Sequence, residues 1–193
     1  MNNETLLQIF VGTLLANNFV LAMFLGLCPF LGVSGRLDTA FPMGVATTFV
    51  IAVASLFAFG LNLLLSALHL EFLRLIAYIV VIASAVQLVE MVLKKHSPRL
   101  FRALGIYLPL ITTNCAVLRV TLIQTSREYT LAQSLTFALG GGAGFTLALV
   151  LMAGLRERVA LAGVPGIAQG AALTLMLAGM LSLAFMGFAG IGS

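Results

Sequence analysis

The chain has 193 residues, of which 61% are hydrophobic and 8% are charged. Its mean hydropathy is +1.15, and a water-soluble domain needs far more polar surface than this composition provides. The composition therefore excludes a soluble globular protein and predicts that most of the chain faces lipid. The net charge is +4. Basic residues scattered through membrane loops set topology, so this charge gives no reason to expect a nucleic-acid partner.

Six apolar stretches follow one another along the chain, separated by charged and turn-forming residues. They cover residues 5–33, 41–67, 72–93, 103–123, 130–154 and 170–191. A membrane-spanning helix needs about 20 apolar residues, so each stretch is long enough to span. We therefore predict an all-α integral membrane protein with six transmembrane helices. The prediction places all of residues 1–193 in a single membrane domain, because no stretch remains for a separate soluble domain.

The basic residues are distributed unequally between the two sides of such a bundle. If successive connections alternate sides, one side carries Arg36, Lys94, Lys95, Arg99, Arg102, Arg156 and Arg158. The opposite side carries Arg74, Arg119 and Arg127. Because cytoplasmic loops are enriched in Lys and Arg, the first set is expected in the cytoplasm. Both termini are then expected on the outer, periplasmic side.

Three spans in each half of the chain suggest an internal repeat. If the halves, about 1–97 and 98–193, share an ancestor, the second lies upside down relative to the first, as in the inverted repeats of many transporters. The only two cysteines, Cys28 and Cys115, are 87 residues apart (115 minus 28), and the same offset carries the second span almost onto the fifth.

The first and fourth spans contain groups that interrupt a helix. Residues 26–35, around Cys28, include three glycines and a proline. Residues 108–117, around Cys115, begin with Leu-Pro and continue into Thr-Thr-Asn, whose side chains can satisfy freed backbone groups. We therefore predict broken half-helices in spans 1 and 4. Discontinuous helices in corresponding places of two halves indicate a site near the middle of the membrane.

The two cysteines allow three interpretations. A buried free cysteine usually acts as a small hydrophobic residue. A disulfide between Cys28 and Cys115 is a second possibility, although nothing in the sequence requires one. The third is a metal site, because thiolates are preferred ligands of zinc and of iron-sulfur clusters. A 2Fe-2S cluster held by cysteines needs four thiolates, so this interpretation demands a second polypeptide that supplies the other pair.

A glycine-rich run, Gly140–Gly144, lies inside the fifth apolar stretch. It lacks the lysine of a phosphate-binding loop, and we predict that its small residues allow helices to approach closely. Four asparagines at membrane depth can bond across helices, bond to unwound backbone or line a polar path: Asn17, Asn18, Asn62 and Asn114. Arg156, Glu157 and Arg158 form a charged cluster that we place in a loop, where it could dock a partner.

Three segments together resemble a known family. They are Asn17–Val20, Phe24–Phe30 and Leu108–Val117, and the likeness continues through Gln87–Met91, Arg156–Arg158 and Met180–Gly187. The chain resembles the A-type subunits of the bacterial Rnf electron-transport complex, which correspond to the E-type subunits of the sodium-translocating NADH:quinone oxidoreductase. The motif Gly-Leu-Cys-Pro-Phe, residues 26–30, is more similar to the Rnf subunits, because the related motif lacks the proline.

The resemblance implies a subunit of an ion-translocating oxidoreductase (a translocase) in the bacterial cytoplasmic (inner) membrane, with no catalytic site of its own. The subunit would pair with a homologous Rnf E-type subunit of opposite orientation and assemble with subunits of the B, C, D and G types. Cys28 and Cys115 would supply half the ligands of a shared 2Fe-2S cluster that relays electrons across the membrane. Electron transfer between ferredoxin and NADH would be coupled to Na⁺ or H⁺ movement.

Arg119 departs from the family pattern, which has a small residue, usually glycine, at this position. It lies four residues after Cys115, so either the fourth span ends early or the side chain turns toward a polar interface. Two other functions fit the residues alone. A stand-alone secondary transporter with inverted repeats, or a structural scaffold, would tolerate Cys28→Ser and Cys115→Ser, whereas an electron relay would lose its cluster.

Overall fold

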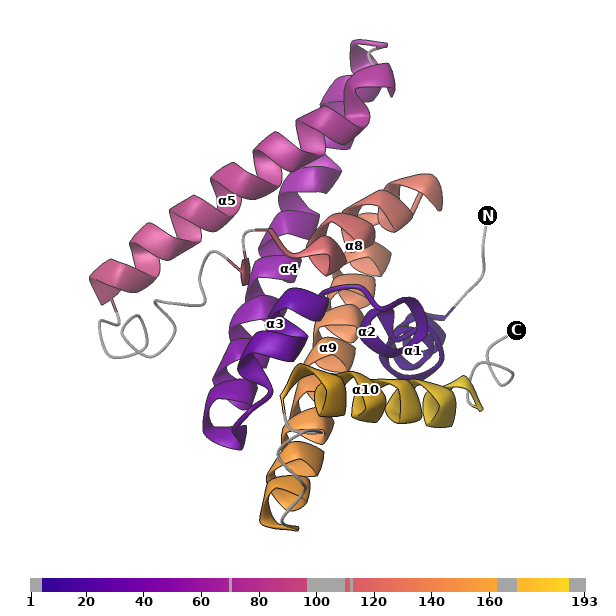
Figure 1. Cartoon of the computed structure of the whole chain (residues 1–193). Coiled ribbons are helices and arrows are strands. Elements are labelled where there is room, and N and C mark those ends of the chain that lie inside the picture. The colour runs from indigo at the N-terminus through magenta and orange to yellow at the C-terminus, as the bar shows by residue number, and fades with distance from the viewer. Residues whose placement is uncertain (1–4, 70, 97–109, 112, 163–169, 188–193) are drawn as a thin grey trace.

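The computed structural model describes residues 5–69, 71–96, 110–111, 113–162 and 170–187, and the structural statements below concern these residues. The described chain consists of helices and short connections, without a β-strand (Figure 1). The prediction of an all-α protein is therefore confirmed. Two long helices, α4 (Leu37–Ala67) and α9 (Leu131–Leu161), dominate the structure.

The remaining helices are shorter. They are α1 (Leu6–Val11), the π-helical turn η1 (Gly12–Ala16), α2 (Phe19–Met23), α3 (Leu27–Val33), the 3₁₀ turn η2 (Glu71–Leu73), α5 (Arg74–His96), α8 (Cys115–Ser126) and α10 (Ala171–Met186). Helices α4 and α9 have 31 residues each and are apolar enough to cross a membrane. At a rise of about 1.5 Å per residue, each is longer than the hydrocarbon core of about 30 Å.

The observed helices follow most of the predicted apolar stretches. Helices α4, α5, α9 and α10 fall on the second, third, fifth and sixth stretches, and the first stretch is divided among α1, η1, α2 and α3. The boundary of α9 differs from the prediction, because the helix continues through Arg156 and Arg158 to Leu161. The placement of this charged cluster in a loop was wrong. Arg and Glu favour helices, and between Arg156 and residue 163 the chain has no Gly or Pro to interrupt one.

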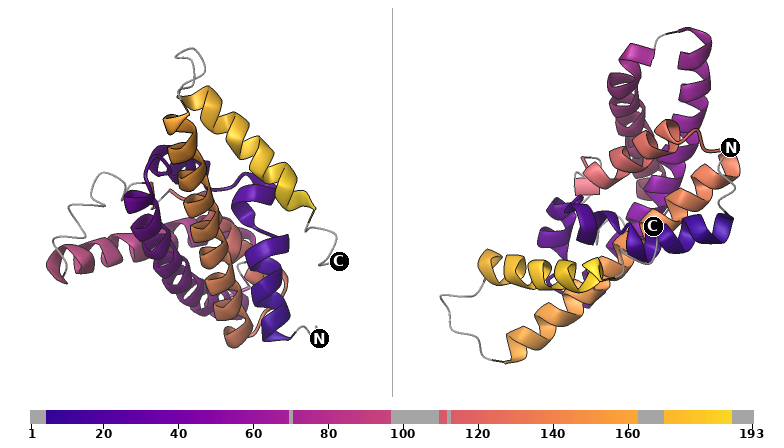
Figure 2. Two further views of the ribbon diagram at one scale, coloured as in Figure 1. Left: turned by 90° about the horizontal axis from the view of Figure 1, so that it is seen from below. Right: turned by 90° about the vertical axis from the view of Figure 1, so that its right-hand side faces the viewer.

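The centre of the molecule is the crossing of α4 and α9, around which the other helices pack. Helices α5 and α8 lie against α4, whereas α1 and η1 lie against α9 (Figures 1 and 2). Helix α10 contacts α2 as well as α9. The buried core runs along the faces of α4 and α9 that meet, with Ala54, Ala58, Ala148 and Leu149 almost completely buried.

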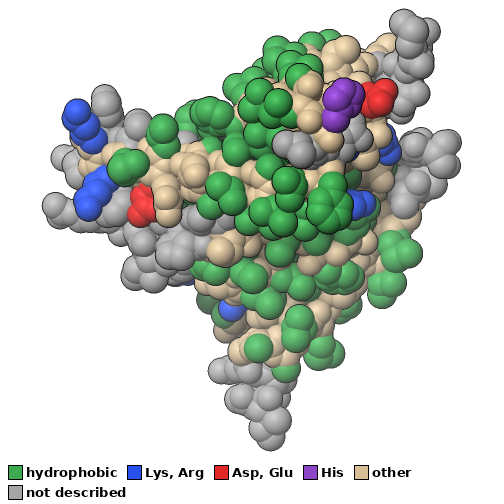
Figure 3. Space-filling model, turned by 90° about the horizontal axis from the view of Figure 1, so that it is seen from above, with side chains coloured by type: hydrophobic (Ala, Val, Ile, Leu, Met, Phe, Trp, Pro, Cys, Tyr) green, Lys and Arg blue, Asp and Glu red, His purple; other side chains and the backbone are tan. Residues whose placement is uncertain are grey.

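Large hydrophobic side chains cover much of the outside of the molecule. Leu7, Phe72, Leu161 and Leu183 each expose more than 70% of their surface, and α1, α4, α5, α9 and α10 all carry exposed side chains of this kind. Figure 3 shows such side chains across the face seen from above, with few charged ones among them. Water would penalise this surface strongly, whereas lipid would not. The surface supports the assignment of a membrane protein.

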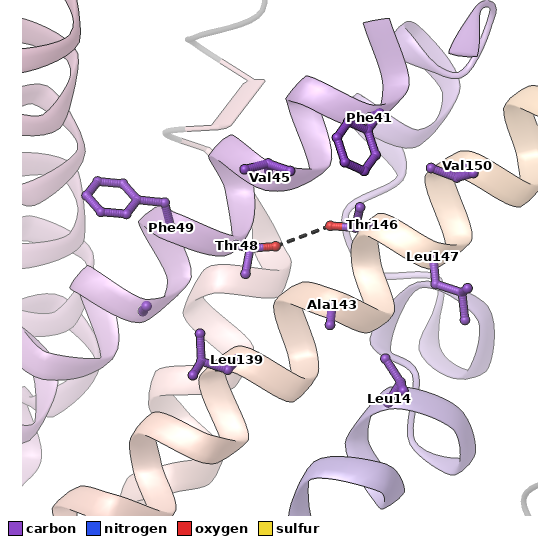
Figure 4. A pocket seen from close by; sticks show the side chains of 11 residues that line it. Leu14, Phe41, Val45, Thr48, Phe49, Leu139, Ala143, Thr146, Leu147 and Val150 are labelled. Carbon is purple, nitrogen blue, oxygen red and sulfur yellow. Dashed lines mark hydrogen bonds between the residues drawn. The ribbon is translucent and has the colours of Figure 1, made fainter. Parts of the chain in front are cut away.

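Two glycine–threonine pairs form the contact between α4 and α9. A Cβ added to Gly44 would lie 2.6 Å from Thr146 Cγ2, and one added to Gly142 would lie 2.6 Å from Thr48 Cγ2. The hydroxyl oxygens of Thr48 and Thr146 are 3.2 Å apart, within hydrogen-bond distance (Figure 4). Glycine in both helices is therefore required for this close approach, and the contact is reciprocal between the two helices.

The glycine run of α9 packs against the N-terminal segment on its other sides. A Cβ on Gly140 would lie 3.0 Å from the carbonyl oxygen of Phe10, and one on Gly144 would lie 3.1 Å from that of Leu14. A Cβ on Gly141 would lie 2.8 Å from the ring of Phe19. The prediction that this run serves helix packing is confirmed.

Candidate functional site

The first interruption lies between α2 and α3, directly before Cys28. Phe24 and Gly26 have left-handed backbones, with φ of 54° and 77°. Gly26 adopts this conformation at little cost because it lacks a Cβ. Cys28 is the second residue of α3 and Pro29 is the third. A proline in the first helical turn has no intrahelical donor to lose, so Pro29 does not break the helix, and the interruption arises upstream of it.

A second break in the same span precedes α2, and Asn18 stabilises it. The Asn18 side-chain oxygen accepts a hydrogen bond from the backbone nitrogen of Val20 at 3.1 Å, which caps α2. Its Nδ2 donates to the carbonyl oxygen of Gly144 at 2.8 Å. Asn18 is only 1% exposed. Of the three roles expected for the membrane asparagines, Asn18 therefore performs two: a bond across helices and a bond to backbone at an interruption.

The interruption before Cys115 is organised in a similar way. Asn114 caps α8 through its side-chain oxygen, which accepts a hydrogen bond from the backbone nitrogen of Ala116 at 3.0 Å. Cys115 is the first residue of this helix, and residues 110–111 form a helical segment before the cap. Thr112 and Pro109, which we expected to contribute to the break, lie outside the described residues. The predicted discontinuity at Cys115 is present.

The two interruptions meet in space. A Cβ on Gly26 would lie 3.0 Å from Asn114 Oδ1 and 2.8 Å from Phe145 Cε2 of α9. Gly26 stands two residues before Cys28, and Asn114 stands directly before Cys115. Segments that are almost ninety residues apart in the chain therefore converge, and each presents a cysteine in the first turn of the helix that follows.

Both cysteines are free thiols, and both are exposed. Neither cysteine is therefore buried within this chain, and the structure contains no disulfide between them. Within the described residues, no group of three or more His, Cys, Asp and Glu side chains could hold a metal ion.

Arg119 shares a helix face with Cys115. The two residues are four apart in α8, the spacing that places side chains one above the other, and both are exposed. The helix continues past Arg119 to Ser126, so this arginine does not end the helix itself.

Helix α8 is held in place by buried polar contacts that the sequence did not indicate. Ser55 Oγ of α4 donates to Gln124 Oε1 at 2.5 Å, and Gln124 Nε2 donates back to the carbonyl oxygen of Ser55 at 3.0 Å. The hydroxyls of Tyr78 and Thr125 are 2.6 Å apart and connect α5 to α8. Buried hydrogen bonds of this kind fix the helix that begins with Cys115.

The fold and the site together define a helical membrane protein in which two interrupted helices each present a free thiol. The family model described as "Rnf-Nqr subunit, membrane protein" matches residues 6–192. The chain belongs to this family.

Three relatives are similar to the chain over nearly its whole length, and each is named as the A-type subunit of an ion-translocating oxidoreductase complex. The protein from Syntrophotalea carbinolica is 56% identical, and the alignment covers 97% of this chain and 98% of the relative. The protein from Erwinia tasmaniensis is 54% identical, with 96% of both chains covered. The protein from Vibrio vulnificus is 51% identical, and the alignment covers 94% of this chain and 95% of the relative.

Proposed function

We propose that this chain is a membrane subunit of an ion-translocating oxidoreductase complex of the Rnf type. Cys28 and Cys115 supply two of the four ligands of a 2Fe-2S cluster. The names of the relatives support the first part of the proposal. The second part is supported by one observation: both thiols are free and exposed, and Gly26 and Asn114, which precede them closely in the chain, contact each other.

The missing ligands come from a partner protein. A cluster held only by cysteines needs four thiolates, and this chain contains two cysteines in total. A homologous E-type membrane subunit in opposite orientation would present its own pair to the same site. When bound, the cluster accepts and releases one electron at a time, which relays electrons across the membrane.

The residues around the thiols are suited to holding negative charge. Cys115 begins a helix of 12 residues, whose first backbone N–H groups carry partial positive charge. Arg119 adds a full positive charge on the same exposed helix face. Phe145 is buried beside Gly26 and Asn114 where the two interruptions converge. These positive groups would offset part of the negative charge of a thiolate-bound cluster at the surface where the partner docks.

The inverted repeat is part of the proposal and is supported by the crossing of α4 and α9. Gly44 and Thr48 correspond to Gly142 and Thr146 with a common offset of 98 residues (142 minus 44), and each pair contacts the other. The capping residues Asn18 and Asn114 are related by a similar offset of 96 (114 minus 18). The two cysteines are related by a different offset, 87 (115 minus 28), which does not relate these pairs. In this repeat Asn114 is the counterpart of Asn18, and the two cysteines are not counterparts.

The remaining parts of the assignment follow from the same proposal. The protein spans the bacterial inner membrane six times with both termini on the periplasmic side, and it assembles with the E type and with subunits of the B, C, D and G types. Electron transfer between ferredoxin and NADH is coupled to movement of Na⁺ or H⁺. A stand-alone transporter is not favoured, because the relatives are named as subunits of an oxidoreductase complex.

Thiol protection tests the proposal. The intact complex is treated with a maleimide, and modification of Cys28 and Cys115 is followed by mass spectrometry before and after iron is removed with a chelator. Both thiols are expected to be protected until iron is removed, and then to react together. Modification of either cysteine in the untreated, iron-loaded complex would contradict the proposal. Gly35→Ser is a suitable control, because an added side chain there meets no atom within 4 Å and should leave protection unchanged.

A further inference from the structure

Arg156, near the C-terminal end of α9, reaches the helix that carries Cys28. Its Nη1 donates to the carbonyl oxygen of Leu31 at 3.3 Å and to the hydroxyl of Ser34 at 3.1 Å. Leu31 lies in the last turn of α3, and Ser34 is the residue that ends the helix. Ser34 is completely buried. One guanidinium nitrogen therefore holds the C-terminal end of α3 against α9.

The neighbouring Glu157 holds the beginning of the next helix. Its Oε1 accepts a hydrogen bond at 2.9 Å from the backbone nitrogen of Leu37, the first residue of α4. The last carbonyls and first N–H groups of helices lack partners within the helix, so both contacts satisfy such groups. The signs also fit, because a cation stabilises the C-terminal end of a helix and an anion the N-terminal end. Two consecutive residues of α9 thus form hydrogen bonds with both ends of the connection between α3 and α4.

A cavity of about 320 Å³ borders the Arg156 side chain, and none of the described residues that line it is acidic. They are Gly35, Arg156, Val159, Ala160, Gly170, Leu173 and Thr174. No carboxylate in this cavity therefore competes with Leu31 and Ser34 for the guanidinium. We predicted that the charged cluster could dock a partner. Arg156 and Glu157 instead have binding partners within their own chain, at the two ends of the connection between α3 and α4.

Helix α3 depends on contacts at its two ends. It has seven residues, too few to be stable by itself, and a left-handed glycine separates it from α2. At the N-terminal end Gly26 packs against Asn114, and at the C-terminal end Arg156 binds Leu31 and Ser34. Leu31 is three residues from Cys28, which is about 4.5 Å along the helix axis. A movement of the C-terminal end therefore displaces the thiol.

We propose that Arg156 is a positioning residue for Cys28, acting through its hydrogen bonds to the C-terminal end of α3. Two acceptors, a carbonyl and a hydroxyl, share one guanidinium nitrogen, and a lysine ammonium has a different reach and shape. Membrane topology alone requires only a positive charge at this end of α9, and Arg158 also provides one. Arg158 is exposed and lies on the same helix, so it is the matched control.

The test uses the intact complex and two measurements. The first is hydrogen exchange by mass spectrometry, with peptides from α3 compared with peptides from α8. In Arg156→Gln the α3 amides are expected to exchange about tenfold faster, while the α8 amides remain unchanged. Arg156→Lys should give an intermediate effect, and Ser34→Ala, which removes one of the two acceptors, a smaller change in the same direction. Arg158→Gln should have none.

The second measurement is the paramagnetic resonance spectrum of the reduced cluster, and only this part rests on the proposed function. Arg156→Gln is expected to broaden the signal and lower the iron content, whereas Arg158→Gln leaves both unchanged. Unchanged α3 exchange in Arg156→Gln and Ser34→Ala would overturn the proposal, as would faster exchange with an unaltered cluster signal. Absence of any cluster in the unmodified complex would instead count against the proposed function, and the exchange data would still decide whether Arg156 anchors α3. If the complex with Arg156→Gln fails to assemble, hydrogen exchange and the cluster spectrum of the Ser34→Ala complex provide the test instead.

Discussion

Gly26 and Asn114 touch where the two interrupted segments converge: a Cβ on Gly26 would lie 3.0 Å from Asn114 Oδ1. The contact joins the residue that begins the turn into α3 to the residue that caps α8. Because Cys28 and Cys115 follow these two residues closely, the separation of the thiols depends on this contact. The absence of a side chain at Gly26 is therefore a structural requirement of the site.

Gly26→Ala should destabilise the protein and weaken the site. Alanine at φ of 77° is strained, and its Cβ would lie 2.8 Å from Phe145 Cε2. We expect the free energy of unfolding to fall by about 2 kcal/mol, measured by thermal unfolding in detergent. Iron content of the complex should fall as well. Gly32→Ala in α3 is the control, because its nearest neighbour would be Leu110 Cδ1 at 3.9 Å. Equal stability of the two variants would contradict the account.

Asn18→Ala should lower stability through two lost contacts. The substitution removes the cap of α2 and the bond from Asn18 Nδ2 to the carbonyl oxygen of Gly144. The expected loss is about 1–3 kcal/mol of unfolding free energy. The exposed neighbour Asn17 provides the comparison, since Asn17→Ala should change stability by less than about 0.5 kcal/mol. Denaturation of both variants in the same detergent distinguishes them, and a larger effect at Asn17 would refute the assignment.

Gly44→Ala should loosen the contact between α4 and α9. The added Cβ meets three atoms of the Thr146 side chain within 3 Å, so we expect a loss of about 1–3 kcal/mol. Combining it with Thr146→Gly should recover part of this loss, and a double-mutant cycle measures the coupling. Gly60→Ala, on the same helix with nothing within 4 Å, should be tolerated. Strict additivity in the cycle would show that the two residues do not meet.

Arg119→Ala should make the cluster harder to reduce. A positive charge on the face of Cys115 stabilises the more negative reduced state, so its removal lowers the midpoint potential by on the order of tens of millivolts. Arg119→Lys keeps the charge and should stay near the unmodified value. Redox titration followed by paramagnetic resonance provides the measurement. A shift of equal size in both variants would mean that charge is not the cause.

Much of this fold could be predicted from composition and from residues with strong local effects. The apolar stretches located α4, α5, α9 and α10, because lipid-spanning helices require long apolar runs. The breaks near Cys28 and Cys115 were found because Gly, Pro and Asn mark interruptions. The cause of the first break was assigned less well, since the turn lies at Phe24 and Gly26 and Pro29 merely begins α3.

Contacts between distant segments could not be predicted in the same way. Gly44 and Thr146 are ordinary residues in apolar stretches, and nothing local indicates that they face each other. The bond from Arg156 to Leu31 joins residues 125 positions apart, and a charged triplet near the membrane boundary is explained equally well by topology. The capping role of Asn114 was detectable, since an asparagine directly before an apolar run is a frequent helix cap.

The central claim is that Cys28 and Cys115 bind one cluster together with a partner protein. The most direct test measures iron content and the reduced-state paramagnetic resonance spectrum of the purified complex carrying Cys28→Ser or Cys115→Ser. Each substitution alone should abolish or strongly alter the 2Fe-2S signal, while the variant protein still assembles with its partner. A cluster signal that remains unchanged in both variants would contradict the claim.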